Sequence, residues 1–234
     1  SYTRVYLNGT YWGLYMFVEE ASRIIDRNPK HLTVVIGSGS IKKAATDAAA
    51  AERMRDLLNN ADMIGQTVEE AQAILTRYER GERNFSKMTP TETIDALHRR
   101  GKKGQVTLLT NGGDGAFIAT DGGRNRTAIF HAKGPEIVPV NTNGAGDGTL
   151  AATLDSILRG DDPAVAVAIG TANGYRIVQE QGSLDGGGNR AELQETLHTH
   201  GEGFLITEHQ LGRRGLRFGR ALSYAGAAAL MRMT

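Results

Sequence analysis

Strand-like and helix-like segments alternate along most of this sequence, and that alternation limits the fold more than any other feature. Short β-branched, apolar runs are typical of buried strands, and longer segments with apolar residues on one face are typical of helices. The predicted strands are 5–9, 32–36, 61–65, 105–110, 116–120, 127–130 and 136–140, and the predicted helices are 14–26, 44–58, 148–158, 162–179 and 191–198. This order predicts a layered α/β fold with a largely parallel sheet, interrupted by antiparallel strands within 105–130.

Two further helices are predicted from their first residues. Thr67 precedes Glu70 by three positions, and Thr89 precedes Glu92 in the same way. In such a capping box, the threonine hydroxyl and the glutamate carboxylate each accept a hydrogen bond from the backbone N–H of the other residue. Pro90 also suits the first helical position. We therefore expect helices to begin just after Thr67 and Thr89.

Composition excludes some functions and leaves others open. The 234 residues include 40% apolar residues, enough for one substantial core, and no cysteine, which excludes disulfides and cysteine-ligated zinc. The formal net charge of +1 predicts no overall attraction to nucleic acid or anionic membranes. No apolar run reaches the roughly 20 residues needed to cross a bilayer. We expect an intracellular protein, cytoplasmic or organellar, whose start at Ser1 is processed or truncated.

A glycine loop between a predicted strand and a predicted helix carries the clearest chemical signal. Gly144 and Gly146 flank Ala145, and Asp147 stands at the helix entrance. The first N–H groups of a helix lack internal partners and lie at the positive end of its dipole, so this loop suits a phosphate. Asp147 there predicts a general base that accepts a proton from an attacking hydroxyl. The alternative is structural: the glycines only make a turn, and Asp147 only caps the helix.

The segment Val140–Asp147, followed by Arg159-Gly160, resembles the signature of the ribokinase-like (PfkB-type) family of sugar and nucleoside kinases. Its Thr-Asn before the glycines most resembles the adenosine kinase branch. Further segments are similar to family segments in the same order, namely 5–38, 61–71, 107–116, 172–173 and 181–182. The resemblance implies a three-layer α/β/α sandwich with a largely parallel central sheet, truncated on its amino-terminal side.

The resemblance also implies an ATP-dependent phosphotransferase acting on a sugar or nucleoside hydroxyl. Asp147 would be the base, and an anion hole would be formed by the N–H groups of Gly144, Ala145 and Gly146. Such a site takes ATP and Mg²⁺, with the metal held mainly by phosphates and water. In the family an acidic residue stands at position 141 and tunes a monovalent cation or phosphate network, whereas this chain has Asn141.

Residues farther from the loop receive roles by the same resemblance. Glu70 would place the magnesium through water, although Thr67 replaces the family's asparagine and a plain capping box explains Glu70 equally well. Residues that would contact the nucleotide are Thr110, Gly112, Asn143 and Asn173. The family's amino-terminal portion, which provides most sugar contacts, has no counterpart here, so the acceptor stays open.

The carboxy-terminal residues suggest a second interpretation. We expect a kinase core over 1–200 and a basic, glycine- and alanine-rich extension over 201–234. Residues 212–220 carry four arginines; they are typical of a solvated tail or surface helix, or of a segment that binds RNA or an acidic protein. The competing function is therefore a catalytically degenerate kinase fold serving as a structural or RNA-associated subunit. The polar group His198, His200, Glu202 and His209 is typical of solvated surface residues, and the alternative is a metal site.

Overall fold

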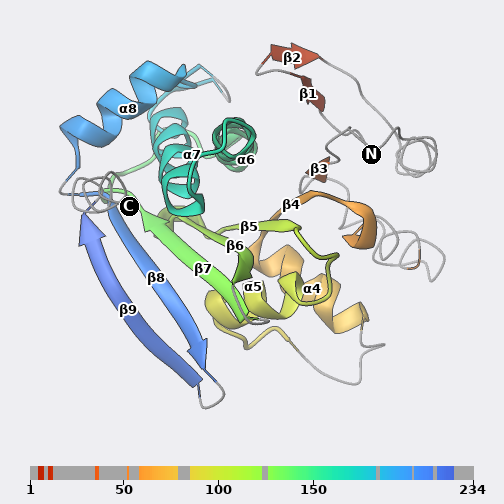
Figure 1. Cartoon of the computed structure of the whole chain (residues 1–234). Helices are drawn as coiled ribbons and strands as arrows, with labels where there is room; N and C mark the ends of the chain where they lie inside the picture. Colours follow the sequence, from red (N-terminus) through yellow and green to blue (C-terminus); the bar gives the residue numbers. More distant parts are fainter. Residues whose placement is uncertain are drawn as a thin grey trace. The chain divides into compact units, whose positions relative to one another are not determined.

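The computed structural model describes residues 5–7, 10–12, 35–36, 52, 58–78, 85–122, 126–182, 185–201, 203–212 and 215–223. Contacts divide the chain into two compact units (Figure 1). The first comprises Ser1–Leu109 with Ala119–Thr127, and the second comprises Thr110–Ile118 with Ala128–Thr234. Within the described ranges, no helix has the length and apolar character needed to cross a membrane.

The first unit contains one antiparallel and one parallel strand pair and two capped helices. β1 (Val5–Leu7) pairs antiparallel with β2 (Thr10–Trp12), and β3 (Val35–Ile36) pairs parallel with β4 (Met63–Thr67). β5 (Val106–Thr110) follows β4 in the hydrogen-bonding order. α4 (Val68–Tyr78) packs on α5 (Pro90–His98) and on β4. The apolar core of this unit includes Met63, Ile64, Leu75, Ile94, Leu97 and Leu108.

Buried polar side chains fix the junctions of the first unit. The Gln105 Nε2 atom donates to the carbonyl oxygens of Leu58 (2.7 Å) and Ala61 (2.9 Å) and so holds the chain just before β4. His98 ends α5 with its ring between the Thr107 hydroxyl, 3.2 Å from Nδ1, and an Asp121 carboxylate oxygen, 3.3 Å from Nε2. Because a polar group costs free energy when buried without a partner, these bonds allow the two side chains to be buried.

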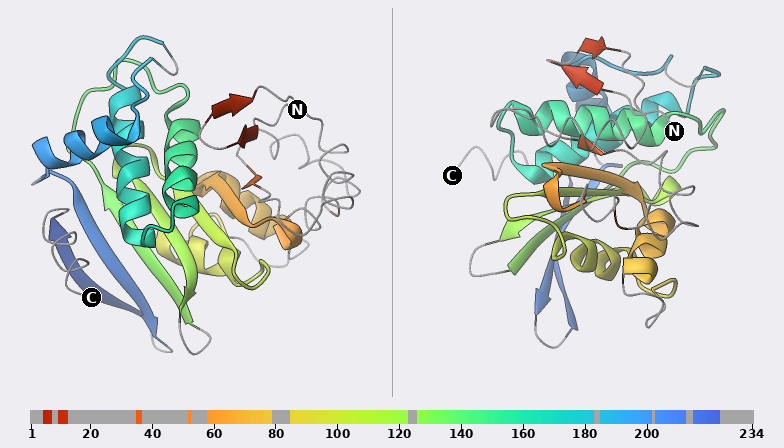
Figure 2. Two further views of the ribbon diagram at one scale, coloured as in Figure 1. Left: turned by 45° about the horizontal axis from the view of Figure 1, so that its top comes forward. Right: turned by 90° about the vertical axis from the view of Figure 1, so that its right-hand side faces the viewer.

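The second unit contains antiparallel strands and three helices. Its strands are the first part of β6 (Ala116–Gly122), most of β7 (Arg126–Lys133), β8 (Leu205–Gly212) and β9 (Gly215–Ser223), in that hydrogen-bonding order, with β7–β8 and β8–β9 antiparallel. The helices are α6 (Ala145–Leu158), α7 (Pro163–Ile177) and α8 (Arg190–Thr199). α7 packs on α6, on α8 and on β8, and α6 and α7 lie side by side (Figure 2).

Glycines on α7 allow this close approach of α6. A Cβ atom at Gly170 would lie 2.0 Å from the Thr153 hydroxyl, and one at Gly174 would lie 2.4 Å from the Thr149 hydroxyl. These distances are far below van der Waals contact, so a larger side chain would push the helices apart. The packing of α7 against Thr149 and Thr153 therefore fixes the position of α6 in space.

Most predicted elements of the described ranges are present, including both capping-box helices, but two expectations need correction. Residues 136–140 form no strand: Pro139 has no N–H to donate to a sheet, and Val138 is 90% exposed. Residues 215–223 form strand β9 rather than a tail or surface helix. The predicted α/β fold is present, and its described strands pair in both directions, parallel at β3–β4 and antiparallel at β7–β8 and β8–β9. The predicted helix 14–26 lies outside the described residues, as does most of 44–58.

Candidate active site

The start of α6 is open, unlike the starts of the other described helices. Its N-cap is Gly144, with φ 82° and ψ −12°, and this residue makes no side-chain cap hydrogen bond. An L-residue with a side chain adopts this left-handed conformation only at a cost, so glycine suits the position. α4, α5, α7 and α8 all have side-chain caps. The first amides of α6 therefore have neither a helical acceptor nor a competing side-chain oxygen at the N-cap, which is the geometry of an anion site.

The loop before α6 is tied to the turn that follows α7. The Asn141 Nδ2 atom donates to the Gln181 carbonyl oxygen (2.6 Å), and its Oδ1 accepts from the Asn143 N–H (2.9 Å). The Val140 N–H donates to the Val178 carbonyl oxygen (2.7 Å). An aspartate at 141 has no N–H to give to Gln181. Asn141 therefore adds a bond that the family's acidic residue cannot make, while Asn143 lies exposed in the loop.

A second loop, from Thr110 to Gly115, approaches the start of α6. Thr110 ends β5, and a 3₁₀ turn, η2 (Gly112–Asp114), follows. Gly112 and Gly115 have φ values of 53° and 83°, and a Cβ at Gly115 would lie 2.0 Å from the Ala132 carbonyl oxygen. The Thr110 Oγ1 atom lies 3.7 Å from the position of a Cβ on Gly146. The structure thus brings Thr110 and the α6 start together, with half-buried Asp147 in the next position of the first turn.

Comparison with known proteins decides the family. The profile described as pfkB family carbohydrate kinase matches residues 24–186, well over half of the chain. This chain belongs to the pfkB carbohydrate kinase family. No curated protein sequence matches it.

Solved structures of the ribokinase type share its fold. A candidate ribokinase II of E. coli in complex with ATP and Mg²⁺ superposes with a TM-score of 0.61 at 19% identity, over 78% of this chain and 53% of that one. Ribokinase of Arabidopsis thaliana with ribose and ATP gives 0.56 at 18%, over 77% and 51%. The aminoimidazole riboside kinase of Salmonella enterica gives 0.55 at 19%, over 77% and 56%. The pfkB chain spans little more than half the length of these proteins, and its fold is ribokinase-like α/β.

Asn173 is placed in this pfkB fold by protein contacts. It is buried in α7, its Nδ2 donates to the Gly148 carbonyl oxygen (2.9 Å), and its Oδ1 accepts from the Gly188 N–H (2.9 Å). The side chain therefore joins α6, α7 and the loop before α8. The predicted position near the adenine stays a prediction.

Glu70 forms the capping box that the sequence predicts. The Thr67 N–H donates to Glu70 Oε2 (3.0 Å), and the Glu70 N–H donates to Thr67 Oγ1 (3.2 Å). Its role toward magnesium stays a prediction. The described residues contain no group of three or more metal-ligating side chains. His198 and His200 are exposed, His209 is buried, and Glu202 lies outside the described residues.

Sequence reasoning missed the residues that hold the Thr110–Gly115 loop. His131 Nε2 lies 2.6 Å from the Asp114 carbonyl oxygen, and Lys133 Nζ lies 3.2 Å from an Asp114 carboxylate oxygen. Nothing in the local spacing signals these contacts, because each joins residues 17 or more positions apart. The one sequence feature that relates His131 and Lys133 is their spacing of two positions, because residues at that spacing on a strand project to the same side.

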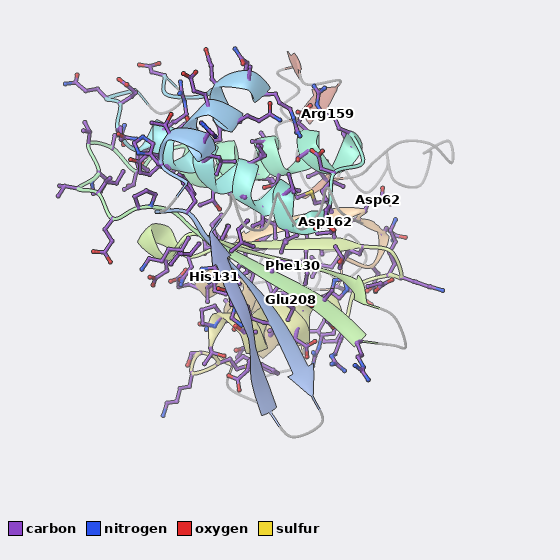
Figure 3. The ribbon with its side chains drawn as sticks, turned by 60° about the vertical axis from the view of Figure 1, so that its left-hand side comes forward. Asp62, Phe130, His131, Arg159, Asp162 and Glu208 are labelled. Atoms are coloured by element: carbon purple, nitrogen blue, oxygen red, sulfur yellow. The ribbon has the colours of Figure 1, made fainter. Side chains whose placement is uncertain are left out.

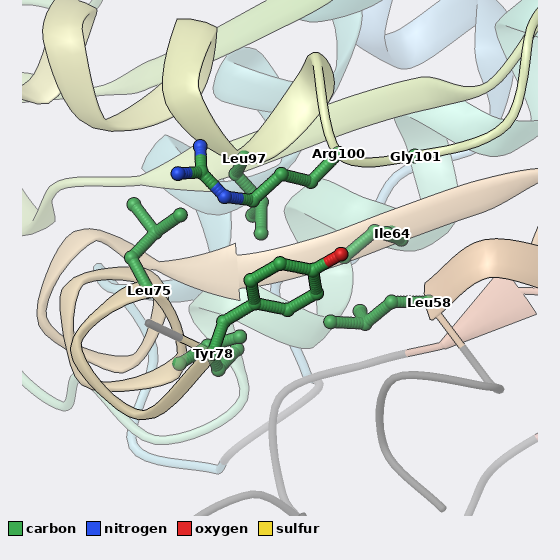
Figure 4. Close-up of a pocket in the computed structure, with 8 residues that line it drawn as sticks. Leu58, Ile64, Leu75, Tyr78, Leu97, Arg100 and Gly101 are labelled. Carbon is green, nitrogen blue, oxygen red and sulfur yellow. The ribbon is translucent and has the colours of Figure 1, made fainter. Parts of the chain in front are cut away.

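The first unit also contains a small cavity between α4, α5 and β4 (Figure 4). Its volume is about 10 Å³, and apolar side chains such as Leu58, Ile64 and Leu97 line it together with Tyr78 and Arg100. That space holds about one water molecule. The cavity is therefore far too small for a nucleotide.

Proposed function

We propose that this chain carries the nucleotide-binding and phosphoryl-transfer site of an ATP-dependent kinase whose acceptor is a sugar or nucleoside hydroxyl, adenosine-like by the signature. The observation that carries the proposal is the uncapped start of α6, with Thr110 beside Gly146 and Asp147 in the first turn. Family membership and the ATP-bound ribokinase structures support it.

Each group has a chemical task in this proposal. The N–H groups of Gly144, Ala145 and Gly146 stabilise negative charge that develops on the transferred phosphoryl group. Asp147 accepts the proton of the incoming hydroxyl, and positioning by the two loops supplies the rest of the rate. The Thr110–Gly115 loop receives the remaining phosphates, with Thr110 and Gly112 as its contacts and Asn143 and Asn173 on the nucleotide side.

The residues present fit ATP because the exposed Gly112 and Gly113 and the uncapped helix leave backbone N–H groups for phosphates. Magnesium neutralises phosphate charge when bound. It would be held mainly by those phosphates and by water, with Glu70 as the predicted indirect partner. A monovalent cation near Asn141 belongs to the same proposal.

The decisive experiment compares wild type with Asp147→Asn in Mg·ATP-dependent phosphorylation of adenosine, ribose and related sugars. We expect kcat to fall by roughly 100- to 10,000-fold, the usual contribution of a general base, while affinity for an ATP analogue and the melting temperature change little. Asp155→Asn is the matched control, because Asp155 lies in the same helix and pairs with exposed Arg159 (2.8 Å). Equal turnover by wild type and Asp147→Asn would falsify the mechanism.

The competing function is a catalytically degenerate kinase fold that acts as a structural or RNA-associated subunit. It is favoured by the arginine-rich segment 212–220, which lies beyond the matched residues 24–186. In this alternative, residues 201–234 bind a protein or RNA partner and 1–200 serve as scaffold. Retained RNA or partner binding without any nucleotide affinity in the wild-type chain would favour it over the kinase.

A further inference from the structure

Two side chains of β7 hold the Thr110–Gly115 loop by contacting Asp114, one at its backbone oxygen and the other at its carboxylate. His131 contacts the Asp114 backbone oxygen at 2.6 Å, and Lys133 contacts the Asp114 carboxylate at 3.2 Å. Residues i and i+2 of a strand project to the same side, so His131 and Lys133 reach the loop together. Figure 3 shows His131 on β7. Between them, the Ala132 carbonyl oxygen lies where a Cβ of Gly115 would stand, so the loop backbone is seated directly on β7.

The chemistry of this contact fixes the protonation of the ring. A carbonyl oxygen only accepts hydrogen bonds, so Nε2 of His131 carries the hydrogen. Burial lowers the pKa of His131, so the neutral Nε2–H tautomer is the form present near neutral pH. Lys133, which also lies 3.8 Å from Glu136, acts in the same direction on that pKa. The contact is therefore a hydrogen bond from a neutral donor, and it does not depend on a charged histidine.

Aromatic neighbours fix the orientation of that donor. The His131 ring stacks on Phe117, with ring centres 4.0 Å apart and planes 3° from parallel. His209 of β8 lies 6.0 Å from His131 and 6.1 Å from Phe117, and it is 8% exposed. Residue 209 lies beyond the segment that matches the family profile. His209 of β8 thus lies beside the stacked rings of His131 and Phe117, which helps to keep Nε2 directed at the loop.

We propose that His131 and Lys133 are positioning residues that hold the Gly112–Asp114 turn in the conformation that receives ATP's phosphates, with Phe117 and His209 as the support of His131. The assignment rests on the proposed function for its nucleotide part. A loop that is already ordered loses less conformational freedom when it binds a ligand. The clamp that His131 and Lys133 form on Asp114 should therefore affect nucleotide affinity more than the rate of the chemical step.

Three variants separate the donor from the stacking. His131→Phe keeps an aromatic ring on Phe117 and removes the donor, His131→Gln restores an N–H donor at a similar reach, and Lys133→Met removes the second contact. Arg126→Gln is the control, because Arg126 is exposed at the other end of β7. For His131→Phe we expect the Kd for an ATP analogue and the KM for ATP to rise roughly five- to tenfold, the usual effect of one lost hydrogen bond, with kcat changed less than about twofold.

Hydrogen–deuterium exchange of the nucleotide-free protein tests the clamp without any activity. The amides of Asp114 and Gly115, which donate to the carbonyl oxygens of Asn111 and Gly112, should exchange faster in His131→Phe and Lys133→Met, and at the wild-type rate in His131→Gln and Arg126→Gln. Unchanged exchange in His131→Phe overturns the proposal, as does unchanged nucleotide affinity in a protein whose wild type binds nucleotide. A wild type that binds no nucleotide refutes the proposed function instead, and exchange alone then decides whether the clamp exists.

Discussion

Glu70 and Asp147 both lie in the first turn of a helix, three residues after its N-cap, but their surroundings differ. At α4 the N-cap is Thr67, and its hydroxyl and the Glu70 carboxylate exchange bonds with each other's backbone N–H groups. At α6 the N-cap is Gly144, which has no side chain to offer. α5 and α8 follow the α4 pattern, with the pairs Thr89–Glu92 and Asn189–Glu192. The residue three positions earlier thus decides whether an acidic side chain closes a helix start or leaves it open for a ligand.

The two helix starts are also held in place by different means. The start of α4 is stabilised locally, by hydrogen bonds between residues three apart. The start of α6 depends on packing against α7, where Gly174 faces Thr149 and Asn173 bonds to Gly148. A local cap gives up the N–H groups that a phosphate needs, whereas packing from the side leaves them available. In this chain the open start of α6 is supported by the neighbouring helix α7 rather than by a local cap.

The largest effect should come from Gly174→Val, which attacks that support. A Cβ at 174 would lie 2.4 Å from the Thr149 hydroxyl and 3.4 Å from the Ala145 carbonyl oxygen, so the first turn of α6 has to move. Overpacking of this kind costs about 2–3 kcal/mol. We expect that loss in urea unfolding, together with weaker binding of an ATP analogue. Ala191→Val, the exposed control in α8, should leave both unchanged, and a stable, nucleotide-binding Gly174→Val protein would contradict the dependence of the α6 start on α7.

A smaller effect is expected at the start of α4. Thr67→Ala removes the hydroxyl that accepts from the Glu70 N–H, which typically costs about 1 kcal/mol. Glu70→Gln removes the charge but keeps an amide oxygen that can accept from the Thr67 N–H, so it should cost less. Phosphotransfer measured against Mg²⁺ concentration provides the discriminating readout. If Glu70 acts only as a cap, both variants keep the wild-type dependence; a shift confined to Glu70→Gln restores its predicted role toward magnesium.

The sequence predicts those features that depend on neighbouring residues. Both capping boxes are visible as a threonine and a glutamate three positions apart, and the α6 start is visible as glycines before an aspartate. The apolar run 136–140 misleads, because composition cannot tell whether a partner strand is present, and Val138 and Val140 are 90% and 60% exposed. β9 is missed for the opposite reason, because its arginines and glycines do not look like a strand although β8 pairs with it.

The candidate site shows the same division. Asp147 and its loop are predicted by the spacing of the glycines and the aspartate. The approach of Thr110 to the α6 start and the hydrogen bond of His131 to Asp114 arise only when distant segments meet. Asn173 illustrates an intermediate case. Its position in α7 is predictable from the helical pattern, whereas its bonds to Gly148 and Gly188 depend on how α6 and the later loop pack.

The smallest effect is a loss of folding stability at acid pH. It tests whether the buried hydrogen bonds of His98, rather than a helix cap, stabilise part of the first unit. Burial lowers the pKa of His98 from the usual 6.5, although the Asp121 carboxylate opposes the shift. Asp121 accepts from Nε2–H, so the neutral ring accepts from the Thr107 hydroxyl at Nδ1. Between the lowered pKa and 6.5 the unfolded chain binds a proton that the folded chain does not, so the free energy of unfolding falls as the pH drops below about 6.5.

His98→Gln isolates this contribution, because a glutamine amide can still donate to Asp121 but does not titrate. His131 and His209 also have lowered pKa values and add to the acid sensitivity of wild type, so the informative quantity is the difference between wild type and variant. Wild type should be more stable at pH 7.5, and its advantage should shrink as the pH falls toward 5, since only wild type loses the His98 contribution. A stability difference that stays constant over this range would mean that His98 titrates alike in the folded and unfolded chains. The stabilising effect of His98 would then not depend on a neutral, buried ring.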